Sequence, residues 1–159
     1  MSVPCAGSDT PATNEDAFAL AALRRSTEIG PLYAALLAVS PLESCRVRSE
    51  LNASTLTYRF AGGGSLRVTR DARIEYTEQE AQFVVPPLQA PAALLLRVER
   101  AEFGAAGCGI DWQRAERASP EVNAGAIDTV FRGDVCNCQA RIRRNAAGHV
   151  VGLALRSTC

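Results

Sequence analysis

The cysteines of this chain constrain its fold more than any other feature. The sequence contains six of them, and two are separated by a single residue in Cys136-Asn137-Cys138. An even number of widely spaced cysteines is typical of a disulfide framework, and disulfides persist in oxidising compartments. We therefore predict an exported protein, periplasmic or secreted, in which disulfides join Cys5, Cys45, Cys108, Cys136, Cys138 and Cys159 in one of fifteen pairings.

Cys136 and Cys138 fall within a predicted C-terminal strand. Residues two apart on a strand point to the same face with Cα atoms about 6.5–7 Å apart, at or beyond the usual limit for a disulfide. Each is therefore expected to pair with a different cysteine. If the last hairpin is centred near Ala146, Cys159 lies opposite Gly133, and it reaches Cys136 only where the register slips or a bulge intervenes.

Two other uses of the cysteines have less support. A thiolate pair at Cys136 and Cys138 with His149 would suit a soft metal, but it needs reduced sulfur and a second closely spaced pair. A lipid anchor at Cys5 is disfavoured because Ser2-Val3-Pro4 is a poor lipoprotein signal and lipidation would leave another cysteine unpaired. We therefore expect no metal and no cofactor, and a mature chain from which a signal peptide has been removed.

Charge limits the class of partner. The chain carries 17 basic and 17 acidic residues, so it has no net field to attract nucleic acid or an anionic membrane. All the basic residues are arginine, which is typical of GC-rich bacterial genomes. No run approaches the roughly 18 apolar residues that span a bilayer, so no transmembrane segment is predicted.

The pattern along the chain predicts helices first and strands afterwards. Residues 1–12 are predicted to be a flexible tail, and 13–159 a single globular domain whose 47% hydrophobic content can fill one core. Helical spacing extends over about 14–39 and is interrupted at Gly30-Pro31. Leu32, Leu36 and Val39 are expected to share one face of the second helix.

From Cys45 onward, apolar and polar residues alternate with the period of two that is typical of half-buried strands. Gly62-Gly63-Gly64 predicts a hairpin turn. The predicted strands lie within about 45–157, at 45–51, 56–60, 66–69, 74–76, 83–85, 94–103, 127–143 and 149–157. We therefore predict an α+β, mainly β fold: an N-terminal helical pair packed on an antiparallel meander sheet or small barrel, braced by disulfides.

Few residues are candidates for catalysis. His149 is the single histidine and follows a hairpin turn, where a side chain is usually exposed and idle. Glu75, Glu78 and Glu80 cluster near a strand, and Asp111 precedes the single tryptophan in a glycine-flanked segment. Carboxylate chemistry needs two acids at a defined separation, which sequence does not report.

Aromatic residues often anchor protein interfaces, and acidic side chains near them add specificity. The candidate partner-binding residues are therefore Tyr76, Glu78, Glu80, Asp111 and Trp112.

Taken together, these features favour a non-enzymatic binding protein with a protein partner, such as an inhibitor or immunity-type protein that binds a toxin or cell-wall hydrolase. The alternative is a carrier of a small apolar ligand, which a large internal cavity would support. A carboxylate-dependent hydrolase comes third and would require two acids facing each other in a cleft. The oligomeric state stays open.

Overall fold

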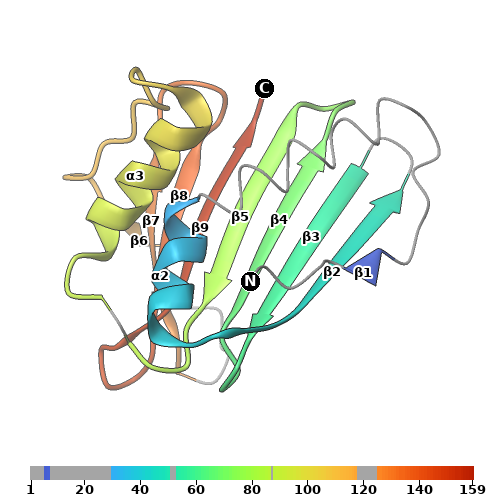
Figure 1. The fold of residues 1–159 in the computed structure, drawn as a ribbon. Coiled ribbons are helices and arrows are strands. Elements are labelled where there is room, and N and C mark those ends of the chain that lie inside the picture. The colour runs from blue at the N-terminus through green and yellow to red at the C-terminus, as the bar shows by residue number, and fades with distance from the viewer. Residues whose placement is uncertain (1–5, 8–29, 51–52, 87, 118–124) are drawn as a thin grey trace.

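The computed structural model describes residues 6–7, 30–50, 53–86, 88–117 and 125–159 (Figure 1). Its elements, in chain order, are β1 (Ala6–Gly7), α2 (Pro31–Val39), β2 (Leu42–Glu50), β3 (Ala53–Phe60), β4 (Ser65–Asp71), β5 (Tyr76–Gln82), α3 (Pro91–Phe103), β6 (Glu116–Arg117), β7 (Ile127–Arg132), β8 (Gln139–Arg144) and β9 (Val150–Thr158). The predicted tail at 1–12 and the first predicted helix at 14–28 lie outside the described residues, apart from β1.

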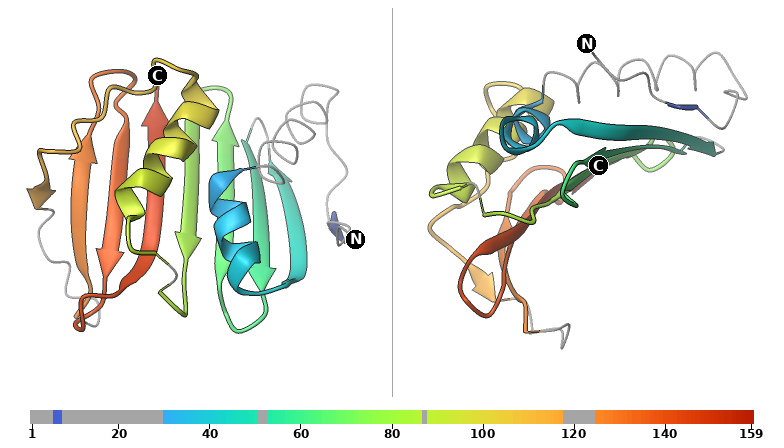
Figure 2. Two further views of the ribbon diagram at one scale, coloured as in Figure 1. Left: turned by 60° about the vertical axis from the view of Figure 1, so that its left-hand side comes forward. Right: turned by 60° about the horizontal axis from the view of Figure 1, so that its bottom comes forward.

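All the strands belong to one sheet, in the order β1-β2-β3-β4-β5-β9-β8-β7-β6. Neighbouring strands are antiparallel except for β1, which pairs in parallel with β2 through two residues. Both described helices lie on the same face of this sheet (Figure 2). The mainly β prediction with helices on an antiparallel sheet is therefore confirmed, and the sheet is open rather than closed into a barrel.

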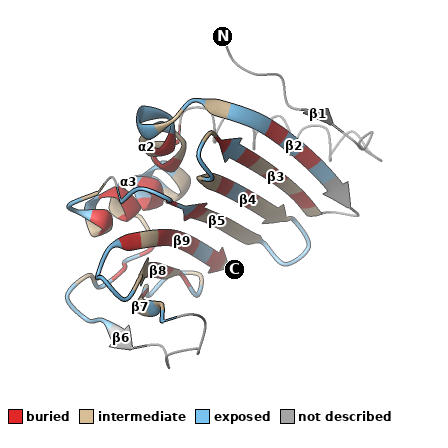
Figure 3. Cartoon of the chain, turned by 90° about the horizontal axis from the view of Figure 1, so that it is seen from below, coloured by how far each residue is buried: buried red, intermediate tan, exposed pale blue. Residues whose placement is uncertain are grey.

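Alternation along the strands sends apolar side chains to the helix-covered face. In β3, Leu56, Tyr58 and Phe60 are buried while the residues between them are more exposed (Figure 3). The register places Leu66 opposite Tyr58 and Val68 opposite Leu56, so the buried residues of β4 extend the same layer. This period-two pattern is why the predicted hairpin through Gly62–Gly64 is correct in both its strands and its turn.

Helix α2 confirms the second predicted helix. Pro31 occupies its first turn, where a missing backbone N–H costs nothing, and the helix ends at Ser40. Leu32 and Leu36, one turn apart, are buried against the sheet, but Val39 is 46% exposed and does not share their environment. The predicted common face of these three residues is therefore correct for two of them.

The prediction of a long apolar strand at 94–103 is wrong, because this segment forms most of helix α3. Its buried residues, Pro91, Leu94, Leu95, Val98 and Glu99, follow the spacing of three and four that marks one side of a helix. Pro91 at the start and Gly104, with φ of 77°, at the end are further helix signals. The run of three leucines concealed this period.

Three other strand predictions need correction. Residues 83–85 lie beyond the end of β5. Ile74 lies in the turn between β4 and β5, although Tyr76 begins β5 and the meander continues there as predicted. The predicted strand over 127–143 is broken, because β7 ends at Arg132 and β8 begins at Gln139.

The break contains a tight turn from Val135 to Cys138, closed by a 3.1 Å hydrogen bond from the Cys138 N–H to the Val135 carbonyl. Its central residues, Cys136 and Asn137, both have positive φ, as in a type I′ turn. The two cysteines therefore do not share a strand face, contrary to the prediction.

The two cysteines do have different partners, as predicted. Cys138 is bonded to Cys108, with Cα atoms 5.9 Å apart, and Cys136 to Cys159, with Cα atoms 4.4 Å apart. Cys45 is also disulfide-bonded, and Cys5 lies outside the described residues.

The register of the last hairpin explains how Cys159 reaches Cys136. Arg144 lies opposite Val150, so the hairpin is centred on Ala147 rather than Ala146, and a bulge between Arg143 and Arg144 shifts the register by one further residue, so that Gln139 lies opposite Arg156. Three residues beyond this pair on each segment, Cys136 and Cys159 meet, instead of the Gly133 and Cys159 expected for a regular hairpin centred on Ala146. The pairing therefore results from a shifted turn together with a bulge, the two kinds of irregularity that it was predicted to need.

The Cys108 loop is fastened to both layers of the fold. The buried Glu99 side chain of α3 accepts a hydrogen bond from the Cys108 N–H. On the sheet side, a Cβ added to Gly133 would lie 2.6 Å from the Cys108 carbonyl oxygen and 3.0 Å from the Cys138 Cβ. Only glycine therefore allows the loop to approach this closely.

Candidate functional site

The face of the sheet opposite the helices carries a cluster of alternating charges. The cross-strand register places Glu80 opposite Arg67, Glu78 opposite Arg156, and Asp128 opposite Arg143. All of these side chains alternate with residues of the covered face, so they point to the open side. We call the following residues the charged face: Arg67, Glu78, Glu80, Asp128, Arg141, Arg143 and Arg156.

Two short ion pairs organise the charged face. Arg67 Nη2 lies 2.7 Å from Glu80 Oε2 and 3.8 Å from Glu78 Oε1. Arg143 binds Asp128 through two hydrogen bonds, from Nε at 2.7 Å and from Nη2 at 2.9 Å. A forked contact of this kind fixes the orientation of both groups.

Arg141 lies between these two ion pairs but forms no short ion pair with the carboxylate of either. Its nearest carboxylate oxygens are Glu80 Oε1 at 3.8 Å and Asp128 Oδ2 at 3.9 Å. Both distances exceed a hydrogen bond, so the guanidinium is held by charge from two sides. Its N–H donors therefore stay available to a further acceptor.

The pKa values of the two glutamates on the charged side of β5 are shifted in opposite directions. Burial raises the pKa of Glu78, and the hydrogen bond and negative charge of Glu80 raise it further. Burial also acts to raise the pKa of Glu80, but the charges of Arg67 and Arg141 outweigh it and leave that pKa lowered. Glu78 is thus the member of the pair that takes up a proton first as the pH falls.

Asp128 is held in its charged form. The hydrogen bonds from Arg143 lower the pKa of Asp128, against an opposing effect of burial, and the charges of Arg143 and Arg141 lower it further. This carboxylate therefore stays ionised across the neutral and mildly acidic range.

The structure brings three of the five predicted partner-binding residues together. Tyr76, Glu78 and Glu80 project from one side of β5, and the Tyr76 hydroxyl donates a hydrogen bond to Glu78 Oε2. Glu75, in the preceding turn, is exposed. Glu78 and Glu80 lie two residues apart on the same side of β5.

Asp111 and Trp112 lie elsewhere. Trp112 packs on Phe131 with ring centroids 5.2 Å apart, and Phe131 belongs to the covered face. Asp111 accepts a 3.1 Å hydrogen bond from the Gln113 N–H, which makes a local turn. Trp112 therefore lies on the other side of the sheet from the charged face, and Asp111 belongs to the turn next to it.

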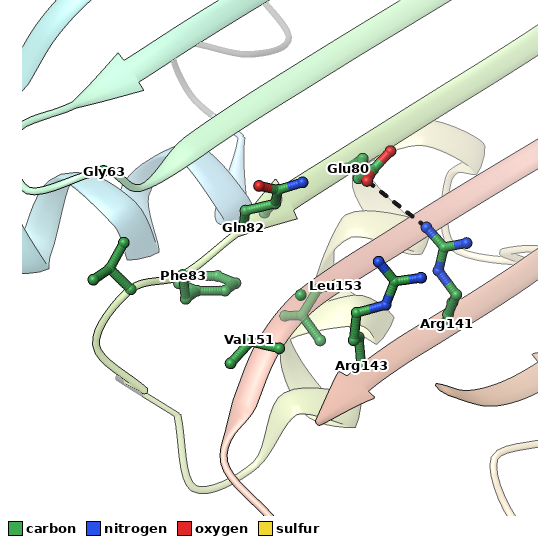
Figure 4. Close-up of a pocket in the computed structure, with 11 residues that line it drawn as sticks. Gly63, Glu80, Gln82, Phe83, Arg141, Arg143, Val151 and Leu153 are labelled. Atoms are coloured by element: carbon green, nitrogen blue, oxygen red, sulfur yellow. Dashed lines mark ion pairs between the residues drawn. The ribbon is translucent and has the colours of Figure 1, made fainter. Parts of the chain in front are cut away.

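A hollow of about 280 Å³ lies beside the charged face over Gly152. We call it the Gly152 pocket. Figure 4 shows Arg141 and Arg143 on one side and Phe83 and Val151 on the other. Its lining residues are Gly63, Glu80, Ala81, Gln82, Phe83, Val84, Arg141, Arg143, Val151, Gly152 and Leu153.

A smaller hollow of about 140 Å³ is apolar. It lies where the end of α2 meets the β3–β4 hairpin, and it shares Phe83 and Val84 with the Gly152 pocket. Val84 and Val85 are exposed there. The two hollows are therefore neighbours that have these two lining residues in common.

Sequence reasoning did not single out the arginines and Asp128 of the charged face. One signal was present, because Arg141 and Arg143 alternate with Ala140 and Ile142 in a segment predicted to be a strand. The signal that the sequence lacked was the strand order, which places β9 beside β5 and β8 on the far side of β9.

The structure also bears on the alternatives of a metal site at Cys136 and Cys138 and of a transmembrane segment. Cys136 and Cys138 are each oxidised to another cysteine, so they do not form a thiolate pair with the exposed His149. No cluster of three metal-ligating side chains occurs among the residues that the structure describes. In the same part of the chain, no helix is long and apolar enough to cross a bilayer.

Comparisons of this chain with protein families, with curated proteins and with solved structures find no match. The charged face and the Gly152 pocket are therefore the features of this chain that bear on its function.

Proposed function

We propose that this protein is an exported, non-enzymatic binding protein that docks a protein partner on its charged face. The observation that carries the proposal is the contrast between the two sides of the sheet. The helices α2 and α3 cover one side (Figure 2), and no described element packs on the charged face. A large, ordered and uncovered surface in the middle of a sheet is available for recognition.

The charges on this face support a protein partner over nucleic acid. Acidic and basic side chains alternate from strand to strand, so the face does not present the continuous positive stripe that neutralises a phosphate backbone. A mosaic of both signs is instead complementary to a mosaic on another protein. Such complementarity speeds association and excludes wrong partners.

The face is also rigid before binding. Its side chains stand on the neighbouring strands β4, β5, β9, β8 and β7, and short ion pairs hold Arg67 and Arg143 in place. A surface ordered in advance loses little conformational entropy on association. This is the property expected of a tight-binding inhibitor or immunity-type protein.

The disulfides are consistent with a place of action outside the cytosol. Cys108–Cys138 and Cys136–Cys159 are of the kind that persists in oxidising compartments. We propose a periplasmic or secreted location, with a toxin or a cell-wall hydrolase as the class of partner.

Charge reversal on the face tests this function. The oxidised protein, immobilised, is exposed to periplasmic extract, the captured protein is purified, and its affinity is measured against variants. Arg156→Glu places a negative charge beside Glu78 at an exposed position, and we expect it to weaken binding at least tenfold. The matched control is Arg100→Glu on the exposed side of α3, which should bind like the natural protein.

Inhibition is measured with the same pair of variants. The captured hydrolase or toxin should lose activity on adding the natural protein or Arg100→Glu, and retain it with Arg156→Glu. Equal binding of both variants would show that the charged face is not the docking surface.

A further inference from the structure

The charged residues that line the Gly152 pocket are all in short ion pairs except Arg141. Of its lining residues, Glu80 is already bound to Arg67 at 2.7 Å, and Arg143 is bound to Asp128 by a fork. Once these pairs are set aside, the positive charge of Arg141 is left facing the hollow. The pocket is therefore matched to a single negative charge.

The Arg141 guanidinium is positioned to receive that charge. Glu80 and Asp128 attract it from two sides at 3.8 and 3.9 Å. Among the described residues, its nitrogen atoms donate no hydrogen bond at normal length, although a guanidinium has five N–H donors. A planar guanidinium held in this way can bind a carboxylate through two parallel hydrogen bonds.

The opposite side of the pocket is apolar. Phe83 and Val151 stand across from Arg141 and Arg143 (Figure 4), and Val84, 61% exposed, joins the pocket to the apolar hollow beside α2. A ligand there would place a charged group on one side and an apolar group on the other. At about 280 Å³, the pocket is just below the roughly 300–1,000 Å³ of drug-sized sites, so it suits one residue better than an extended ligand.

Gly152 deepens the pocket, because it has no side chain to fill the space above the strand. It lies opposite Gln82 on β5 and Arg143 on β8, and it occupies the same face of β9 as Ala154 and Arg156, the open face. A Cβ added there would lie 3.4 Å from the Arg143 Cβ and 3.6 Å from the Ala81 carbonyl oxygen, both ordinary contacts. Glycine is thus not needed for the backbone, and the space it leaves open is available to a ligand.

We propose that the Gly152 pocket binds the C-terminal residue of the protein partner, with its carboxylate on Arg141 and an apolar side chain against Phe83, Val84 and Val151. This inference rests on the proposed function and adds the chemistry of the anchor. A C-terminal residue carries a carboxylate and a side chain on the same carbon, which matches the two sides of the pocket. A phosphate dianion fits less well, because Glu80 and Asp128 lie next to Arg141 and would repel its second charge.

The test uses a defined probe rather than the unknown partner. The acetylated tripeptide Ala-Ala-Leu with a free carboxylate is titrated into the oxidised, isotope-labelled protein, and backbone amide shifts are followed. We expect a Kd on the order of 1 mM for so small a ligand. The shifts should be concentrated at Val151, Gly152 and Leu153, and the same peptide with a C-terminal amide should bind at least tenfold more weakly.

Two variants and one control locate the site. Arg141→Gln removes the charge, and Gly152→Ala raises the floor while leaving Arg141 in place; each should weaken the free-acid peptide at least tenfold. Arg59→Gln removes an exposed arginine from β3 and should bind like the natural protein. Thermal unfolding checks that all three variants fold.

Each outcome decides the proposal. It is overturned if the acid and amide peptides bind equally, if Gly152→Ala leaves the affinity unchanged, or if N-acetyl-aspartate amide binds as tightly as the tripeptide. A silent pocket combined with loss of partner capture by Arg156→Glu would reject this inference and leave the proposed function standing. A responsive pocket with capture unaffected by Arg156→Glu would reject the charged face as the docking surface and leave the pocket only as a site for a carboxylate.

Discussion

The two faces of the sheet are built from the same strands but obey different rules. On the covered face, side chains such as Leu56 and Leu66 are fully buried and contact α2, α3 or one another. On the open face, the side chains between them are charged and paired across strands, as in Arg67–Glu80 and Arg143–Asp128. One face holds the fold together, and the other displays ordered charge.

This difference predicts that the stability of the fold and the proposed binding depend on different faces of the sheet. Burying apolar area stabilises a protein by roughly 25 cal/mol per Å², whereas partly exposed ion pairs contribute about 0–1 kcal/mol. Changes on the open face should therefore alter binding with little loss of stability. Changes on the covered face should do the opposite.

The largest expected contrast comes from two adjacent residues of β3. Leu56→Ala removes a side chain with no exposed area and should destabilise the protein by about 2.7–5 kcal/mol. Thr57→Ala, on the open face, should cost at most about 1 kcal/mol. Urea unfolding measures both, and similar losses for the two variants would refute the division between the faces.

The second prediction concerns the Cys108–Cys138 disulfide, which lies on the covered side of the sheet. Replacing Cys108 and Cys138 together by alanine opens a link across 30 residues, and the loop-entropy relation predicts a loss of about 3–4 kcal/mol. Both cysteines are buried in the core, so part of the cost is lost packing. Urea unfolding in the absence of reductant measures the loss.

Amide hydrogen exchange of the double cysteine variant shows which elements lose stability. Faster exchange should be concentrated in β7, β8 and the end of α3, because these elements flank the disulfide. Equal acceleration in β3 and β4 would mean that the sheet opens as one unit.

The smallest effect is expected on the open face and depends on pH. Asp128→Asn removes the charge that Arg143 binds and should cost about 1 kcal/mol at neutral pH. Because the folded-state pKa of Asp128 is lowered, its stabilising effect is present above the ordinary aspartate pKa and is lost as the pH falls through the lower, folded value. The difference between the natural protein and Asp128→Asn should thus shrink below about pH 4.

Unfolding measured between pH 2 and 7 checks this dependence, and a double-mutant cycle with Arg143→Gln isolates the pair. A difference that stays constant down to pH 2 would show that Asp128 is not held in its charged form by Arg143.

Local patterns allowed part of the fold to be predicted. The strands around Leu56 and Leu66 and their glycine turn follow from alternation and turn chemistry, both of which depend on near neighbours. Helix α3 was missed because Leu94-Leu95-Leu96 satisfies an apolar strand as well as a helix, and only the positions of Pro91 and Val98 separate the two. The break before β8 was missed because positive φ at Cys136 is rare for a non-glycine residue.

The candidate site was predictable only in part. Tyr76, Glu78 and Glu80 share one side of β5 by the period of two, so their grouping is visible in the sequence. Arg67 lies on β4, the preceding strand of the predicted meander, but Arg141 and Arg156 come near β5 only through a strand order that no local pattern encodes. Asp111 and Trp112 were grouped with them on chemical type, and chemical type does not report which side of a sheet a loop joins.

The place of β9 in the sheet sets the order in which the protein can assemble. Residues 150–158 lie between β5 and β8. The strand partner of Tyr76 is therefore Thr158, which is synthesised long after it. Until then β5 presents an unpaired edge, and the charged face exists as two separate pieces. Long-range pairing of this kind slows folding and exposes strands to wrong neighbours, so a nascent chain of this protein should depend on protection until β9 is in place.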